Sequence, residues 1–219
     1  MIKFLLTKKR VESFYPFFLV VLFGCGASDW QVIENFENGK TKSMMLVIDK
    51  EDSTLMIKEI YESGNLKSIY QYNSGNLDGL AIGLYDDGVV AKKVNFKNGA
   101  KHGAELLYFP EGQLRAKFKY NEGIRYDGCF YFKNGQPTAT LTFDSLGAIS
   151  SGVYYYENGN IRSEGAFNEV NRGAKEGYWR NFFENGNIKD EGNYIKGEKK
   201  GEWIYYDSLG NIRMTVPFK

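Results

Sequence analysis

The side chains able to carry out catalysis or bind a metal are few in this sequence. His102 is the one histidine. The chain therefore has no His-x-x-x-His zinc pair and little prospect of a Ser-His-Asp catalytic triad. No Gly-x-Ser-x-Gly elbow, phosphate-binding loop or dinucleotide fingerprint occurs. We expect His102 to be a solvated residue beside a turn, and we expect neither an enzyme nor a bound cofactor.

The remaining reactive residues are also better explained by structure. Cys129 follows Gly128 at the start of a predicted strand, where a small buried filler is the expected role of a free cysteine. Acidic residues recur at equivalent repeat positions, which is typical of turns and of a solvated sheet face rather than of a paired acid and base: Glu157, Glu184, Asp190 and Glu191. The sequence predicts no catalytic residue and no metal site.

The first 24 residues have the pattern of an export signal. Four basic residues precede a short apolar run at 17–23, and Gly24 then precedes Cys25. The run Leu22-Phe23-Gly24-Cys25 resembles the bacterial lipobox, although Phe23 stands where a small residue is commoner. The resemblance implies that Cys25 is the acylated first residue of the mature protein. A plain signal peptide or an uncleaved anchor is the alternative.

Charge and composition narrow the classes of partner. The whole chain carries a formal charge of +1, which becomes −2 when four basic residues and Glu12 are removed with residues 1–24. A nucleic-acid-binding protein needs a basic patch, so no nucleic-acid partner is expected. Aromatic residues make up 16% of the chain, and 25 glycines stand against 4 prolines. This composition favours many short strands joined by tight turns.

Internal repeats dominate the sequence. An aromatic-x-x-Gly motif recurs about every 24 residues, and its glycines are expected to supply the backbone angles of turns: Gly64, Gly88, Gly112, Gly135, Gly159, Gly186 and Gly210. The last copy, from Tyr206 to Gly210, has one extra residue by this count. Between these glycines lies a second set, followed four residues later by a third, as in Gly99 and Gly103 or Gly197 and Gly201. We interpret both further sets as turn residues as well.

The stretch after each first glycine alternates between apolar and polar residues. Leu114, Ala116, Phe118 and Tyr120, for example, are separated by basic residues. A period of two is that of a β-strand with one apolar and one solvated face. Each unit is therefore a hairpin, and the predicted fold is all-β: an elongated, single antiparallel β-meander of about seven 24-residue repeats. We expect residues 25–35 to be a short tether and residues 36–219 to be the repeat domain. Three extra residues between Phe167 and Gly173 predict a bulging loop at 168–172.

The repeat resembles a known family. The run Tyr194-x-x-Gly197-x-x-x-Gly201-x-Trp203-x-x-Tyr206 is similar to the bacterial MORN-variant repeat, and Gly177-x-Trp179 leading to Phe183-Glu-Asn-Gly186 is nearly as similar. The chain is thus identified as a lipoprotein member of this family, whose YwqK-type proteins are labelled as antitoxin components. The resemblance implies a MORN-like fold over about residues 36–219. It implies little about function.

Two features of the predicted sheet could bind a partner. One is its aromatic side, on which we place Tyr154, Tyr156, Tyr178, Trp179 and Trp203. Such aromatic residues either form a binding surface or simply bury one another across strands. The other feature is an exposed sheet edge, which a partner strand could extend.

The function expected from these observations is a non-enzymatic, lipid-anchored scaffold for an unknown protein partner. Its attachment to a membrane would be through lipid on Cys25, and no small-molecule substrate is expected. Gly26 follows the cysteine in place of the Asp that favours inner-membrane retention, so the outer membrane of the envelope is the favoured location. An antitoxin or immunity protein is the alternative function, as the family label implies, and a glycan-binding surface is a third.

Overall fold

The computed structural model describes residues 30–168 and 173–219. Every regular element in these residues is a β-strand. They form two compact units, 30–112 and 113–219. The strands of the first unit are β1 Gln31–Asn35, β2 Thr41–Asp49, β3 Thr54–Ile60, β4 Leu66–Asn73, β5 Asn76–Leu77, β6 Gly79–Leu84, β7 Val90–Lys97 and β8 Ala100–Tyr108. Those of the second are β9 Leu114–Asn121, β10 Ile124–Tyr131, β11 Pro137–Phe143, β12 Ile149–Tyr155, β13 Ile161–Phe167, β14 Lys175–Phe182, β15 Ile188–Ile195, β16 Glu198–Tyr206 and β17 Ile212–Phe218.

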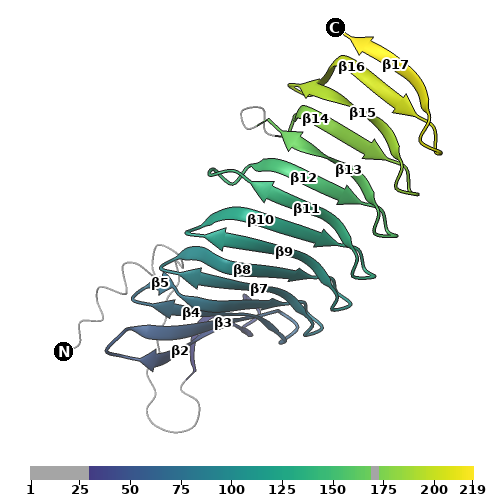
Figure 1. The fold of residues 1–219 in the computed structure, drawn as a ribbon. Coiled ribbons are helices and arrows are strands. Elements are labelled where there is room, and N and C mark those ends of the chain that lie inside the picture. Colours follow the sequence, from purple (N-terminus) through teal and green to yellow (C-terminus); the bar gives the residue numbers. More distant parts are fainter. Residues whose placement is uncertain (1–29, 169–172) are drawn as a thin grey trace. The chain divides into compact units, whose positions relative to one another are not determined.

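Within each unit the strands form an antiparallel meander. β1 pairs with β2, β2 with β3, and β3 with β4, and the order continues in the same way from β6 to β8 and from β9 to β17 (Figure 1). The predicted all-β hairpin meander is therefore confirmed. One boundary differs, because β1 lies within residues 25–35, which we expected to be a tether. Ile33 is buried there and anchors the strand.

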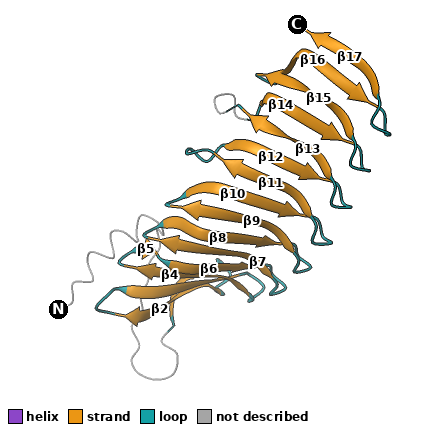
Figure 2. Ribbon diagram, viewed as in Figure 1, coloured by secondary structure: helices purple, strands orange, loops and turns teal. Residues whose placement is uncertain are grey.

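Two kinds of hairpin loop join most of the strands (Figure 2). In the first kind, the carbonyl of the motif's first residue accepts the amide of the glycine three positions later, as from Gly64 to Tyr61 at 2.9 Å. A left-handed residue is required to close such a three-residue loop, and glycine adopts it freely. The glycines of this kind have φ between 77° and 99°: Gly39, Gly64, Gly88, Gly112, Gly135, Gly147, Gly159, Gly186 and Gly210. The second kind is a two-residue loop with positive φ at both residues, as at Asn98-Gly99 and Lys196-Gly197, which is a type I′ turn.

The third set of glycines does not lie in turns. Gly103, Gly177 and Gly201 lie inside β8, β14 and β16, where the register jumps. Between β15 and β16, for example, Asn193 pairs with Lys200 while Glu191 pairs with Ile204. These glycines have φ of 67° to 74° and form β-bulges, which correct our turn interpretation. A bulge needs the left-handed conformation just as a turn does, so the glycine spacing alone could not distinguish them.

The last repeat has no extra residue. The loop before β17 begins at Asp207, whose carbonyl accepts the amide of Gly210 at 3.0 Å, so Asp207 rather than Tyr206 occupies the aromatic position. The Asp207 carboxylate caps the loop by accepting the amides of Leu209 and Asn211, each at 2.9 Å. Asp144 makes the same cap before β12. The loop expected at 168–172 lies largely outside the described residues, but its base is closed by the amide of Asn168 donating to the carbonyl of Ala174.

Alternate residues of each strand face one side, as the period of two predicts. On β9 and β11 the buried positions are Ala116, Phe118, Ala139, Leu141 and Phe143, while the residues between them are more exposed. We call this side the aromatic face, which also carries Trp179 and Trp203, and we call the opposite side the polar face. The core of each unit lies on the aromatic face.

Candidate interaction surface

Large side chains of the aromatic face lie over glycines of the neighbouring strand. Trp179 of β14 covers Gly165 of β13, and Trp203 of β16 covers Gly192 of β15, so closely that a Cβ atom on Gly192 would be 2.5 Å from the indole. Phe118 covers Gly128 in the same manner. A large side chain that fills the space above a glycine gives these hairpins of the second unit a core of their own, without a second layer.

The bulges provide hydrogen bonds for the two indoles. The Trp179 Nε1–H donates to the carbonyl of Ala166 at 2.8 Å, and the Trp203 Nε1–H donates to that of Asn193 at 3.0 Å. Both acceptors follow the covered glycine and lie at the register jumps with the bulged strand. A buried indole needs such a hydrogen-bond partner, and the bulge provides it by leaving a carbonyl on the neighbouring strand free to accept from the indole.

A lysine lies over each tryptophan. The Nζ of Lys175 is 4.0 Å from the ring centroid of Trp179, and that of Lys199 is 3.9 Å from the centroid of Trp203. Desolvation against these rings lowers the pKa of Lys175; the carboxylate of Asp190 opposes the shift and the charge of Lys199 adds to it. Each lysine therefore closes the aromatic face with a cation–π contact.

The five aromatic residues predicted as a binding surface do not form one. Trp179 and Trp203 are 1% and 0% exposed, so they cannot contact a partner, and for these two the mutual-burial interpretation holds. Tyr154 is half-buried, and burial raises its pKa against the opposing charge of Arg162. Tyr156 donates its hydroxyl to the carbonyl of Phe182 at 2.7 Å. Tyr178 is 53% exposed and points to the polar face, because it alternates with Trp179 on β14.

On the polar face, Tyr178 belongs to a cluster around Glu191. The Tyr206 hydroxyl donates to Glu191 Oε1 at 2.6 Å. This hydrogen bond, followed by burial, raises the pKa of Tyr206 to about 12. Burial and the same carboxylate raise the pKa of Tyr178. Arg180, opposite Glu191, forms an ion pair with Glu164. Tyrosine and arginine are the residue types that are enriched where proteins bind one another, and this cluster presents both on the polar face.

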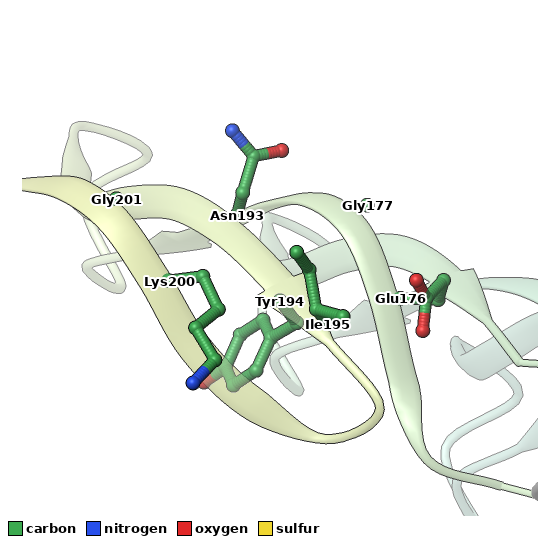
Figure 3. A pocket seen from close by; sticks show the side chains of 7 residues that line it. All are labelled: Glu176, Gly177, Asn193, Tyr194, Ile195, Lys200 and Gly201. Atoms are coloured by element: carbon green, nitrogen blue, oxygen red, sulfur yellow. The ribbon is translucent and has the colours of Figure 1, made fainter. Parts of the chain in front are cut away.

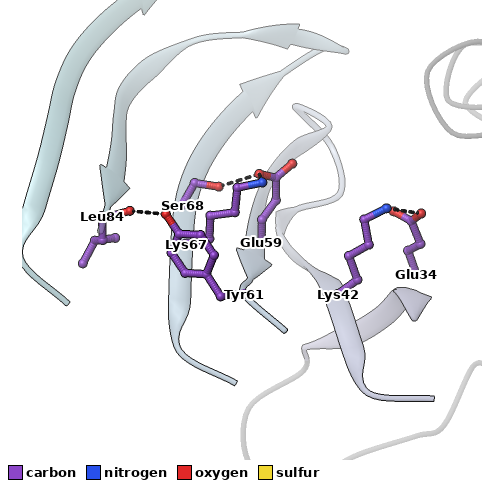
Figure 4. A network of polar contacts seen from close by, with 7 residues as sticks. All are labelled: Glu34, Lys42, Glu59, Tyr61, Lys67, Ser68 and Leu84. Carbon is purple, nitrogen blue, oxygen red and sulfur yellow. Dashed lines mark hydrogen bonds and ion pairs between the residues drawn. The ribbon is translucent and has the colours of Figure 1, made fainter. Parts of the chain in front are cut away.

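Side chains in the three-residue loops tie each repeat to the next. The Tyr61 hydroxyl donates to the carbonyl of Leu84 at 2.8 Å (Figure 4). The Tyr85 hydroxyl donates to the carbonyl of Tyr108, also at 2.8 Å. Asparagines do the same: Nδ2 of Asn185 and of Asn187 both donate to the carbonyl of Ser208 at 2.8 Å. The aromatic-x-x-Gly motif was visible in the sequence. The hydrogen bonds that this motif makes between repeats could not be predicted from the sequence, although the asparagines that recur beside the glycine were a signal for them.

A shallow trough of about 330 Å³ lies in the second unit, between consecutive bulges (Figure 3). Its lining comes from β14, β15 and β16: Glu176, Gly177, Asn193, Tyr194, Ile195, Lys200 and Gly201. Glu176 Oε2 accepts a hydrogen bond from Nδ2 of Asn168 at 3.0 Å and one from the amide of Lys196 at 2.8 Å, and both lower the pKa of this carboxyl. Sequence reasoning did not identify this trough.

The residues considered for chemistry are scattered. His102 is exposed beside the bulge of Gly103. Cys129 is half-buried rather than buried; its register partners are Lys117 and Thr140 on neighbouring strands. A hydrogen bond with Cys129, followed by burial, raises the pKa of Tyr131 to about 12. No group of three or more metal-ligating side chains occurs within residues 30–168 and 173–219.

Within these described residues, no helix is long and apolar enough to span a membrane. Cys25 lies outside the described part of the chain.

Comparison with known proteins identifies the repeat. Four segments match the MORN repeat variant: residues 77–98, 101–122, 152–169 and 175–196. Each contains a hairpin closed by a three-residue loop. The chain is thus a repeat protein that carries MORN-variant repeats. No curated protein matches it.

Solved structures show only remote likeness. The crystal structure of TcdB2-TccC3-Cdc42 is similar over 86% of this chain at 12% identity, with a TM-score of 0.23. TcdB2-TccC3 without its hypervariable C-terminal region is similar over 90% at 10% identity, with a TM-score of 0.24. The chain spans 14% and 11% of the length of those two chains. Likeness this low carries no argument about function.

Proposed function

We propose that this chain is a non-enzymatic scaffold that binds a protein partner through the polar face of its repeats. The observation that supports this proposal is that one face of the sheet is filled by its own side chains while the other is available for contacts. The aromatic face is filled by its own side chains and closed by lysines, as Trp179, Trp203 and Lys199 illustrate. In the second unit the polar face presents Tyr178 and Arg180 of β14 beside Glu191 of β15. Repeats of this kind extend a surface without changing the fold, which suits recognition of a protein.

The proposed location is the bacterial envelope, with the outer membrane favoured. Support comes from the sequence alone, since the lipobox-like run at 22–25 lies outside the described residues. A single acyl chain gives only marginal attachment to a membrane, whereas several chains on one cysteine hold a protein stably. Attachment through Cys25 would leave the repeats free to contact other envelope proteins.

The anchor can be tested by labelling cells with a radioactive fatty acid. We expect wild-type protein and the Cys129→Ser control to incorporate label and to fractionate with membranes. Cys25→Ser should lose the label and appear either as soluble protein or as uncleaved precursor. Unlabelled, soluble wild-type protein would refute the anchor.

The scaffold role can be tested by crosslinking in intact cells, followed by identification of the captured protein. Substitution of Tyr178 by serine on the polar face should reduce capture, whereas Leu146→Ser, at an exposed loop elsewhere, should not. The proposal fails if no partner is captured, or if the purified protein shows a catalytic activity that one substitution abolishes. Growth rescue from a neighbouring toxin on co-expression would narrow the role to immunity.

A further inference from the structure

A sheet edge is one place where the sequence predicts that a partner strand could bind, and β17 forms such an edge. Within residues 30–168 and 173–219, β17 pairs with β16 on one side and with no strand on the other (Figure 1). Ile212 and Met214 are 64% and 52% exposed there. An uncovered edge with apolar side chains invites the addition of another strand, and natural sheets protect such edges.

The repeat shows which backbone groups of β17 face outward. The seventh residue after the loop glycine directs its carbonyl at the next strand in three earlier repeats. The carbonyl of Gln71 accepts the amide of Asp78 at 3.0 Å, and the carbonyl of Asn193 accepts the indole of Trp203 on β16, also at 3.0 Å. The carbonyl of Ala166 accepts from β14 in the same way. In an antiparallel sheet the N–H and C=O of one residue point to the same neighbouring strand, so this residue offers both groups to the strand that follows.

Pro217 occupies this position on β17. It lies seven residues after Gly210, as Asn193 lies seven residues after Gly186. Proline has no backbone N–H, so the outer side of β17 lacks a donor that the equivalent strands have. The inner side keeps its register, in which Pro217 pairs with Glu202 of β16. A proline on the outer side of an edge strand is one of the means by which sheets resist strand addition.

The loop before β17 also directs its polar side chains inward. In the preceding repeat, Asn187 follows the loop glycine and its Nδ2 donates to the carbonyl of Ser208 in the next loop. Asn211 is the equivalent residue, but its Nδ2 donates at 3.1 Å to Oδ2 of Asp207 in its own loop. Asp207 stands where Tyr61 reaches the next repeat with its hydroxyl. The two side chains that join one repeat to the next are therefore used within this loop.

We propose that the outer edge of β17 is blocked against strand addition by Pro217 and by the inward-directed loop from Asp207 to Asn211. The block acts equally against a second copy of this chain and against an extended segment of a partner, because both would need the same backbone donors. The exposed apolar area of Ile212 and Met214 makes such a block necessary. This inference is independent of the proposed scaffold function, and it directs partners to the faces of the sheet.

The test restores the missing donor in the full chain. Pro217→Val and Pro217→Ala each supply an N–H on the outer side, and Pro217 is exposed, so neither substitution disturbs the core. Self-association is measured by sedimentation equilibrium in density-matched detergent. Strand addition is measured by fluorescence anisotropy with a labelled peptide of residues 198–206. This peptide has the sequence of β16, the type of strand that follows such a strand in the repeat.

We expect the wild-type chain to remain monomeric and to leave the peptide unbound. Both Pro217 variants should bind the peptide at least about fivefold more tightly than wild type, as expected for one restored backbone hydrogen bond. Adding Asp207→Tyr to Pro217→Val should strengthen binding further, and adding Met214→Lys should abolish it. Pro137→Val is the matched control, because Pro137 lies on β11, which β10 and β12 cover on both sides. It should behave as wild type.

Three results would overturn the inference. The first is a wild-type chain that binds the peptide, or that self-associates in a manner that Met214→Lys abolishes. The second is that both Pro217 variants leave the peptide unbound while their circular dichroism and urea unfolding match those of the wild type. The third is peptide binding by Pro217→Val that survives Met214→Lys, because the added strand would then lie elsewhere on the chain.

Discussion

Replacing Gly192 by alanine would add one methyl group where the indole of Trp203 already lies. The new Cβ atom would be 2.5 Å from Cδ2 and 2.6 Å from two further ring atoms. The ring cannot easily turn away, because its Nε1–H is bound to the carbonyl of Asn193 and Lys199 lies over it. Overpacking a filled site typically costs about 1–3 kcal/mol, so we expect the free energy of unfolding to fall by about 2 kcal/mol.

Gly83 provides the matched control. It is also a strand glycine outside the left-handed region, and the nearest heavy atom to an added Cβ would be the Lys92 Cβ at 3.9 Å, an ordinary contact. Alanine there should stabilise the protein by about 0.4–1 kcal/mol, because it restricts the unfolded chain. The same substitution should therefore act with opposite sign at the two positions.

Urea unfolding followed by tryptophan fluorescence, together with amide hydrogen exchange, would measure both effects. Hydrogen exchange is needed because repeat proteins can open in parts. The loss in Gly192→Ala should be concentrated in β15 and β16, and Trp203→Leu should relieve it in the double variant. If Gly192→Ala and Gly83→Ala change stability equally, the account of the aromatic face is wrong.

Three further predictions concern charged and titrating groups. Lys199→Met keeps the apolar stem over Trp203 but removes the ammonium, and should lower stability by about 0.5–1 kcal/mol in thermal melts; an unchanged melting temperature would exclude a cation–π contribution. Ultraviolet titration should find Tyr131 and Tyr206 titrating near pH 12, and Glu191→Gln should return only Tyr206 toward 10, since the hydrogen bond to this carboxylate raises the pKa of Tyr206. The raised pKa means that this stabilisation is full below pH 10 and is lost as the pH rises toward 12. Glu105→Ala removes a buried carboxylate that pairs with Lys92 and Lys101, each at 2.8 Å. In urea titrations it should lower the free energy of unfolding by about 1–3 kcal/mol, and an unchanged value would show that these ion pairs do not stabilise the fold.

Local rules account for the strands and for most of the loops. The alternation from Leu114 to Tyr120 places Ala116 and Phe118 on the buried side, and the aromatic-x-x-Gly spacing places Gly112 in its loop. Both features depend on neighbours within a few residues, so they can be predicted from sequence. The bulge at Gly201 could not be predicted in this way, because a bulge is defined by the register of another strand.

The candidate sites show the same limit. Trp179 and Trp203 look like an exposed aromatic surface when only their own strands are considered. Their burial depends on Gly165 and Gly192, which lie on the preceding strands and leave the space that the rings fill. The trough was missed because its residues are spread over three strands.

The sequence by itself determined the repeat, the positions of the strands and the side of each strand on which a residue lies. These properties follow from a period of two and from glycines that alone adopt left-handed angles at low cost. Only the tertiary structure decided which side chains are buried and which remain available to a partner. In a single layer of strands, the space above a residue is set by its neighbour across the hairpin, as Gly192 sets it for Trp203, and that neighbour is chosen by register.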